Sequence, residues 1–466
     1  MLEHGPRPVT KNAAAANGND AYPPTGYAWY VVVILTIAYV FSFLDRQILS
    51  LLVEPIKADL GISDTQMSLL QGLAFGIFYT LLGIPIGRLA DRRSRRAIIA
   101  AGTTIWCLMT AACGLAKNFP QLFLARVGIG IGEAALNPSA FSLISDYFPR
   151  EKRARPMSFY NMGVSLGAGI AMVLGGQVIA WAYGRPPLTL PIVGELFQWQ
   201  TVFLLVGLPG LLVAVMMITV KEPSRKDRIA LSADSHADDH LSIKAVASFL
   251  WERKSTYGTL FLGMSVVTII GYGYFSWIPT MFMRTWDWDI SRIAFAYGVV
   301  ILIFGPLGVN FGGWLAERWY RQGRRAAHMR VALLGACIMV PSSVLAPLMP
   351  TPELAVFMLA PATIGGAIPT ATAGAALMMI VPNQMRAQTT AIYYFVINVL
   401  GLTLGPLLVA VVTDSVFADE SALRYSIAIV SGGAGSIALC FLIMNIRHFR
   451  NSVIEADAWS GGNKQS

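Results

Sequence analysis

The sequence predicts an all-α membrane protein with twelve transmembrane helices in two pseudo-symmetric six-helix bundles. Composition is the first observation, because 55% of the 466 residues are hydrophobic, 13% are charged and the mean hydropathy is +0.57. Such a chain is too apolar for a soluble multidomain protein. The second observation is a series of twelve apolar runs, each near the ~20 residues that cross a bilayer. The third is a basic turn that follows the second run of each half, which indicates an internal duplication.

Each apolar run is expected to form a helix, because a helix satisfies its own backbone in lipid and continuous runs lack the alternation of barrel strands. The runs begin near Trp29, Met67, Ala97, Phe119, Met157, Val202, Thr256, Arg292, Val331, Leu354, Thr389 and Tyr425. They divide the chain into an N-terminal tail (1–26), a first bundle (27–220), a linker (221–255), a second bundle (256–447) and a C-terminal tail (448–466). Within the linker we expect an amphipathic surface helix from Ile243 to Trp251.

The net charge of +9 is placed in a way that indicates membrane topology. Lys and Arg gather in alternate connections, at 92–96, 150–155, 221–228, 318–330 and 447–450. By the positive-inside rule, both termini are expected in the cytoplasm, in a multi-pass protein of a bacterial inner membrane. Short loops offer no basic groove, so no nucleic-acid partner is expected.

Residue types that serve catalysis or metal binding do not occur in useful patterns. The four cysteines lie within the apolar runs and lack metal-ligand spacing, and no histidine lies within a run. The chain has no Gly-Lys dipeptide and therefore no phosphate-binding P-loop. The stretch from Asp234 to His240 has no fixed scaffold for a metal. We therefore expect no cofactor, no metal and no enzymatic activity.

The basic turn Gly87–Arg96 returns in degraded form at Gly313–Arg318. The first copy resembles the signature loop of the major facilitator superfamily, with Ser94 in place of a glycine. This resemblance covers nearly the whole chain and implies the fold of those transporters. It also implies a conformational latch that holds the cytoplasmic side shut. The residues expected in this latch are Asp91, Arg92, Arg95, Asp146, Glu317 and Arg318.

Three segments of the first half are similar to the spinster branch of that superfamily. They are Phe43–Gln47, Val53–Leu60 and the stretch from Arg126 through Glu133 to Pro138. The resemblance implies a lipid cargo of the lysophospholipid or sphingosine-phosphate type.

Four ionisable residues lie within the apolar runs of the first half, where charge is costly and usually functional. Asp45 and Arg46 lie in the first run, and Arg126 and Glu133 in the fourth. Counted along ideal helices, Arg126 lies at the height of Asp45, and Glu133 lies about 10 Å nearer the cytoplasm on the same face. We expect Asp45 and Glu133 to be the proton-coupling pair and Arg126 to switch between them. A fixed salt-bridge cluster that only stabilises the first bundle is the alternative.

The second half contributes aromatic and mildly polar residues to the expected cavity. Its candidates for substrate binding are Tyr272, Trp277, Tyr393, Tyr394 and Asn398. Opposite them, Arg46 and Arg126 are the candidates from the first half.

Together these features predict a proton-linked secondary transporter that moves an amphipathic substrate by alternating access. The expected partners are that substrate, protons and the surrounding membrane lipids, and the protein is expected to act as a monomer. Sugar acids or other small organic anions are the alternative cargo, because Arg46 and Arg126 suit a carboxylate. A receptor or a channel that does not transport remains a further alternative.

Overall fold

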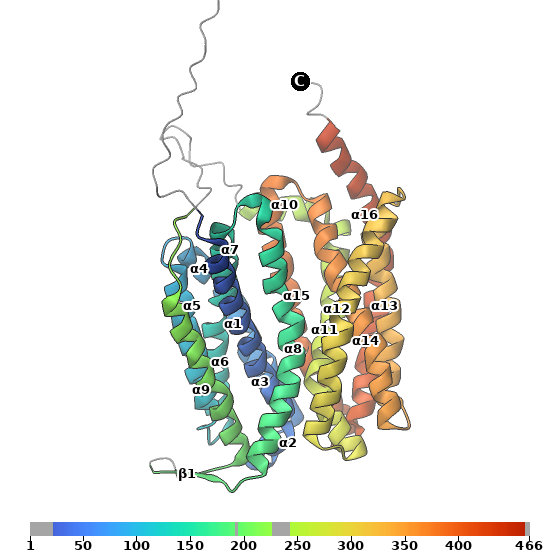
Figure 1. The fold of residues 1–466 in the computed structure, drawn as a ribbon. Coiled ribbons are helices and arrows are strands. Elements are labelled where there is room, and N and C mark those ends of the chain that lie inside the picture. The colour runs from blue at the N-terminus through green and yellow to red at the C-terminus, as the bar shows by residue number, and fades with distance from the viewer. Residues whose placement is uncertain (1–21, 192–193, 226–242, 462–466) are drawn as a thin grey trace, which may run out of the picture.

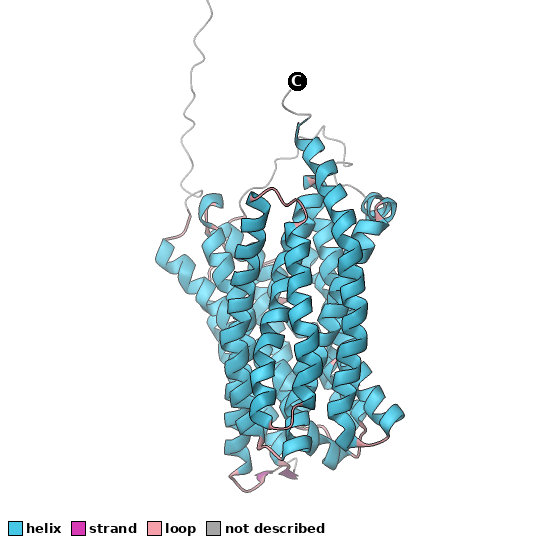
Figure 2. Ribbon diagram, turned by 90° about the vertical axis from the view of Figure 1, so that its right-hand side faces the viewer, coloured by secondary structure: helices cyan, strands magenta, loops and turns pink. Residues whose placement is uncertain are grey.

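The computed structural model describes residues 22–191, 194–225 and 243–461, which form a bundle of long helices (Figures 1 and 2). Among the described residues, twelve helical segments are long and apolar enough to cross a membrane. Each of the twelve predicted runs falls within one of them. The predicted fold class is confirmed, and the protein is a multi-pass integral membrane protein.

The first half, up to the linker, contains nine α-helices and one small sheet in its described part. They are α1 (Thr25–Leu51), α2 (Val53–Leu60), α3 (Asp64–Gln71), α4 (Leu73–Ala90), α5 (Arg95–Cys113), α6 (Phe119–Glu133), α7 (Leu136–Tyr147), α8 (Ala154–Tyr183), β1 (Leu188–Leu190), β2 (Gly194–Leu196) and α9 (Gln198–Thr219). Within this half α1 packs on α8, and α5 packs on α6 and α9.

The linker and the second half follow with seven α-helices. They are α10 (Ile243–Glu252), α11 (Lys254–Trp286), α12 (Ile290–Arg321), α13 (Ala327–Leu345), α14 (Pro352–Ile380), α15 (Arg386–Val411) and α16 (Leu423–Gly461), with a π-helical turn η4 (Val412–Phe417) after α15. Here α13 packs on α14, and α11 packs on α15 and α16.

Both ends of the described chain lie at one end of the bundle, which we call the tail side; α1 begins there and α16 ends there (Figure 1). The opposite end carries the antiparallel strands β1 and β2, paired Leu188 to Leu196, and we call it the hairpin side (Figure 1).

The structure has α10 where the sequence predicts an amphipathic helix. By contrast, α16 runs on to Gly461, past the expected start of a tail at 448. The stretch Asp234–His240 lies outside the described residues.

On the hairpin side, side chains cap the N-termini of several helices. Ser63 and Gln66 form a reciprocal capping box at α3, with hydrogen bonds of 3.2 and 3.0 Å. Asn118 accepts a bond of 3.0 Å from the first turn of α6, and Asp289 accepts one of 2.9 Å at α12. These caps satisfy amide groups that a helix leaves free at its start.

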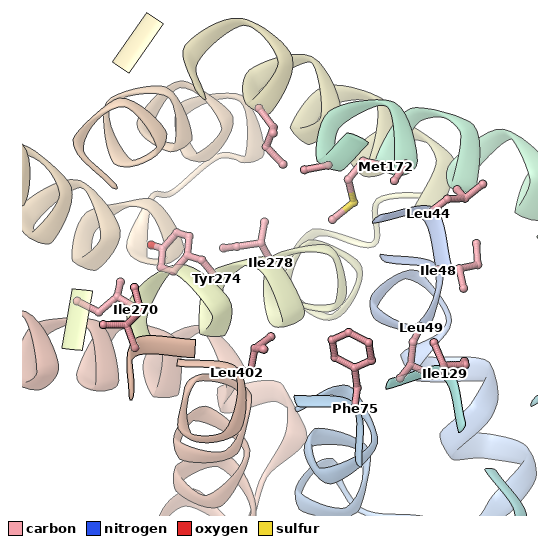
Figure 3. Close-up of a cluster of buried hydrophobic side chains, with 14 of the residues drawn as sticks. Leu44, Ile48, Leu49, Phe75, Ile129, Met172, Ile270, Tyr274, Ile278 and Leu402 are labelled. Carbon is pink, nitrogen blue, oxygen red and sulfur yellow. The ribbon is translucent and has the colours of Figure 1, made fainter. Parts of the chain in front are cut away.

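The two halves meet through α8 on α12, α15 on α3 and α4, and α1 on α11. Small residues permit the contact: a Cβ on Gly72 would lie 2.2 Å from the carbonyl oxygen of Leu402, and one on Gly169 would lie 2.3 Å from Leu302 Cγ. Gly169 therefore lets α8 pack closely against α12. Figure 3 shows the buried cluster at this junction, with Phe75 of the first half and Leu402 of the second.

Candidate transport site

A cavity of about 790 Å³ lies between the two halves. Its lining from the first half comprises Tyr39, Phe43, Arg46, Tyr79, Asn137, Phe141, Asn161 and Val164, and the second half supplies aliphatic, hydroxyl and tyrosine side chains from α11 to α15. Among the described residues that line it, Arg46 is the one with a charged side chain. The lining is therefore aromatic and apolar, with a single cation and scattered hydroxyl and amide groups.

Arg46, the cation that lines this cavity, is also hydrogen-bonded to a buried carboxylate. Arg46 Nε donates a hydrogen bond of 2.7 Å to Glu133 Oε2, and Arg46 Nη2 donates to the same oxygen. Ser42 Oγ adds a third donor at 2.7 Å. The side chain of Glu133 is 0% exposed, whereas that of Arg46 is 13% exposed toward the cavity it lines. The pair thus links a buried carboxylate to the cavity.

Aromatic rings surround the Arg46 guanidinium. Its central carbon lies 4.6 Å from the ring centre of Phe75, 4.8 Å from that of Tyr79 and 5.2 Å from that of Phe43. Such ring faces attract a cation and exclude water, which strengthens its interaction with any anion nearby.

The structure places Arg126 differently from the sequence prediction. Its Nε donates to the Leu70 carbonyl at 3.2 Å and its Nη1 to the backbone carbonyl of Asp45 at 3.3 Å. It forms no ion pair with a described residue, and Glu133 is paired with Arg46 instead. The reason is helix geometry: neighbouring residues diverge by about 100° around the axis, so α1 turns Arg46 toward α6 while Asp45 faces elsewhere.

Both candidate proton carriers are buried and incompletely bonded. Asp45 and Glu133 are each 1% exposed. Asp45 Oδ1 and Glu133 Oε1 receive no hydrogen bond from a described residue. A buried carboxylate oxygen without a donor is costly, and a proton removes much of that cost.

Four of the five second-half candidates line the cavity: Tyr272, Tyr393, Tyr394 and Asn398. The fifth does not. Trp277 is 0% exposed, and its Nε1 donates a hydrogen bond of 2.9 Å to the Pro406 carbonyl. The expected role of Trp277 in substrate contact is corrected: this side chain packs α11 against α15.

The sequence analysis did not predict a series of hydrogen-bonded polar side chains on the cavity wall formed by the first half. Tyr160 donates to Asn137 Oδ1 at 2.6 Å, and Asn137 Nδ2 donates to the Tyr79 hydroxyl at 2.9 Å. Tyr39 stacks on Tyr160 at 5.0 Å between ring centres. The one indication of these hydrogen bonds in the sequence is Asn137, an amide side chain inside an apolar run.

On the tail side, a network forms around Arg95, whose side chain is 1% exposed. Arg95 pairs with Asp146, and its Nε donates to Glu222 Oε1 at 2.7 Å. Ser94 Oγ and the Arg96 amide also donate to Glu222, at 2.8 and 3.1 Å. Burial raises the pKa of the Glu222 carboxyl, but the hydrogen bonds from Arg95 and from the start of α5 outweigh it and hold the pKa below its usual value.

The other expected latch residues lie on the surface in this state. Asp91 and Arg92 are exposed. Glu317 pairs with Arg321 one turn along α12, and Arg318 lies over the Trp314 ring at 5.3 Å. These contacts stay within one half, so the latch role of these four residues remains a prediction for a state with the tail side closed.

On the hairpin side, charged residues join the two halves. Arg284 Nε donates to Glu54 at 2.8 Å, and its two Nη atoms donate to Asp64 at 2.6 and 2.8 Å. Lys57 pairs with Asp64 and, at 2.8 Å, with Glu420 across the junction. In the sequence, Lys57 and Arg284 stand as isolated cations between apolar runs. Their network closes the hairpin side, while the cavity lining reaches toward the tail side at Asn161 and Tyr394.

Comparison with known proteins agrees with this architecture. The model of the Major Facilitator Superfamily matches residues 35–406. An "MFS-type efflux pump" of Mycolicibacterium smegmatis is 29% identical over 434 residues, which cover 92% of this chain and 95% of that protein. A "Probable L-galactonate transporter" of Escherichia coli is 27% identical over 305 residues, covering 63% of this chain and 62% of that protein.

A solved structure extends the likeness to the branch suggested by the sequence. It is a bacterial homologue of the human lysosomal transporter spinster, in an inward-facing and unoccupied conformation, with a TM-score of 0.76 and 26% identity. The alignment covers 93% of this chain and 99% of that one. With the family model and the twelve-helix fold in agreement, this chain belongs to the major facilitator superfamily and is similar to its spinster members.

Proposed function

We propose that the protein is a proton-linked secondary transporter of an amphipathic organic anion. The observation that carries this proposal is the shared position of Arg46, which lines the cavity and is hydrogen-bonded to the buried Glu133. A substrate anion and the Glu133 carboxylate compete for the same guanidinium. Protonation of Glu133 weakens its hold on Arg46 and so favours binding of the anion.

Asp45 takes part as the second titrating group, since it is buried beside the Arg126 contact and has an oxygen without a donor. Two arginines and two carboxylates make the cluster formally neutral when both acids are ionised. Addition of a proton therefore leaves one positive charge, which the substrate anion neutralises. This balance favours binding of the proton and the anion together.

Transport then follows from the geometry of the two halves. The hairpin side is closed by Arg284 and Asp64, and the reverse state requires these bonds to break and the tail side to close. With the tail side in the cytoplasm of a bacterial inner membrane, the present state is inward-facing. We propose that one chain contains the whole pathway and acts as a monomer.

A lipid with a single acyl chain is the leading cargo. The cavity is large for a sugar acid, and most of its lining is aromatic or aliphatic, with one cation at the first-half wall. A lysophospholipid or sphingolipid-like molecule would place its phosphate at Arg46 and its chain along Phe275, Ile301 and Met339.

Sugar acids are the second candidate. The E. coli relative is named as a probable L-galactonate transporter. The hydroxyl and amide groups of Tyr79, Asn137 and Asn398 would suit a polyhydroxylated acid whose carboxylate meets Arg46.

Binding of lysophosphatidate and of galacturonate to purified protein, followed by uptake into proteoliposomes, tests the proposal. We expect saturable binding of one class and uptake that rises with an inward proton gradient, and Arg46→Gln should abolish both. Binding without uptake would indicate a receptor, and ionic conductance a channel; either result would overturn the proposal.

A further inference from the structure

A second, smaller chamber lies beside the main cavity. It holds about 40 Å³ and shares Arg46, Phe43, Tyr272 and Phe275 with the main cavity. One water needs roughly 10–15 Å³ of such space, so the chamber has room for a few waters or one compact ion. Residues of both halves enclose it, including Leu402 and Pro406 of α15.

Two cations face this chamber, and its described lining contains no carboxylate. The cations are Arg46 and Arg126. Arg46 already shares its charge with Glu133. Arg126 is 1% exposed and bonds two backbone carbonyls, but it forms no ion pair with a described residue. Among the acids that the structure describes, Arg126 has only the more distant charges of Asp45 and Glu133 near it. Once a proton neutralises one of these acids, the cluster holds one uncompensated buried positive charge, which waters alone do not balance.

Uncharged donors line the same chamber. Gln71 lies at the end of α3, and both polar atoms of its side-chain amide are buried without a hydrogen bond to a described residue. Gln47 is 4% exposed and Ser276 is 9% exposed, and both contribute to the lining. Amide and hydroxyl donors around an arginine are the groups that bind halides and carboxylates.

We propose that this chamber is a binding site for one compact monovalent anion, held by Arg126, Gln71 and Arg46. The anion is either a free halide or small carboxylate, or the carboxylate of a transported molecule that reaches in from the main cavity. Because α3, α11 and α15 all border the chamber, an anion bound there stabilises the state with the hairpin side closed.

Thermal unfolding of the purified full chain in sodium chloride, formate or gluconate tests the site at equal ionic strength. We expect chloride and formate to raise the unfolding temperature saturably, and gluconate, which is too large to enter the chamber as a free ion, to act more weakly. Gln71→Leu should raise the half-saturating concentration about tenfold, as expected for one lost hydrogen bond to an ion. Gln71→Glu should unfold at a higher temperature without added anion and should not respond to it, because its own carboxylate then faces Arg126. Gln177→Leu, at an exposed position of α8, is the matched control and should respond like the wild type.

A second measurement does not depend on the variants. Crystals grown in bromide should give an anomalous peak between Arg126 and Gln71. Loss of that peak on adding galacturonate would identify a substrate carboxylate as the competitor, and its persistence would identify a free anion; both results support the site. Equal responses to all three salts, or an empty chamber at saturating bromide, would overturn the proposal and leave the transport proposal standing.

Discussion

Arg284 holds Asp64 through two parallel hydrogen bonds of 2.6 and 2.8 Å, and the two residues belong to different halves of the molecule. Asp64 is 0% exposed and Arg284 is 8% exposed. Asp414 adds a bond of 2.7 Å to the Thr65 amide at the start of α3, again across the junction. The closed hairpin side therefore depends on a few buried, charge-assisted contacts that can break and reform.

Arg284→Met should shift the protein toward the state with the hairpin side open. Lys57 still pairs with Asp64 after the substitution, so the loss of the two Arg284 hydrogen bonds should cost about 1–3 kcal/mol, and this cost falls on the closed state alone. Spin-label distances across the hairpin side should lengthen. The control is Arg292→Met, because Arg292 is 61% exposed and pairs with Glu353 inside its own half. Equal distance distributions in both variants and the wild type would remove Arg284 from the gate.

Substitution of Trp277 should change the stability of the protein, whereas substitution of Tyr394 should change its affinity for substrate. Trp277→Phe leaves the Pro406 carbonyl without its donor and should lower the free energy of unfolding by about 1–3 kcal/mol, with substrate affinity unchanged. Tyr394→Ala removes a ring that lines the cavity and should raise the half-saturating substrate concentration about fivefold. Denaturation and binding curves of the two variants check both expectations, and the opposite pattern would restore Trp277 to the binding site.

The Glu222 network predicts a pH dependence on the tail side. The pKa of Glu222 in the folded protein lies below its ordinary value, so its bonds contribute stability above the ordinary pKa of about 4.3. That contribution is lost as pH falls through the lowered pKa. Glu222→Gln should cost about 1 kcal/mol at pH 7 and should remove part of the stability lost on acidification. If acidification lowered the stability of the variant and of the wild type by equal amounts, this role of Glu222 would be contradicted.

Asp91→Asn should slow transport without weakening the present state. Asp91 is exposed here, so its proposed role belongs to the state with the tail side closed, where a carboxylate would bond a neighbouring helix start. We expect reduced flux, unchanged substrate affinity and longer spin-label distances across the tail side. Unchanged tail-side distances in the variant would remove the latch role.

The sequence was sufficient for the twelve spans, because continuous apolar runs and alternating basic loops follow directly from the bilayer. It also located the charged residues of α1 and α6. It did not determine which arginine pairs with Glu133, since an all-apolar helix has no periodicity that fixes its rotation. The same ambiguity placed Trp277 in the cavity, although it faces α15.

The hairpin-side network was beyond sequence reasoning for another reason. Lys57 and Arg284 are separated by more than two hundred residues, and each resembles an ordinary cation at a helix end. Lys57 meets Asp64 within the first half, but only the junction of the halves brings Arg284 to the same carboxylate. Contacts between distant segments of this kind depend on tertiary packing and on the conformational state.

The competition for Arg46 between Glu133 and a substrate anion is tested most directly by uptake into proteoliposomes across a range of pH. Wild-type uptake of the bound substrate should rise with an inward proton gradient. Glu133→Gln and Asp45→Asn imitate the protonated acids, so both variants should still bind substrate while uptake loses its dependence on pH. If both variants kept the pH dependence of the wild type, proton coupling through these two carboxyls would be contradicted.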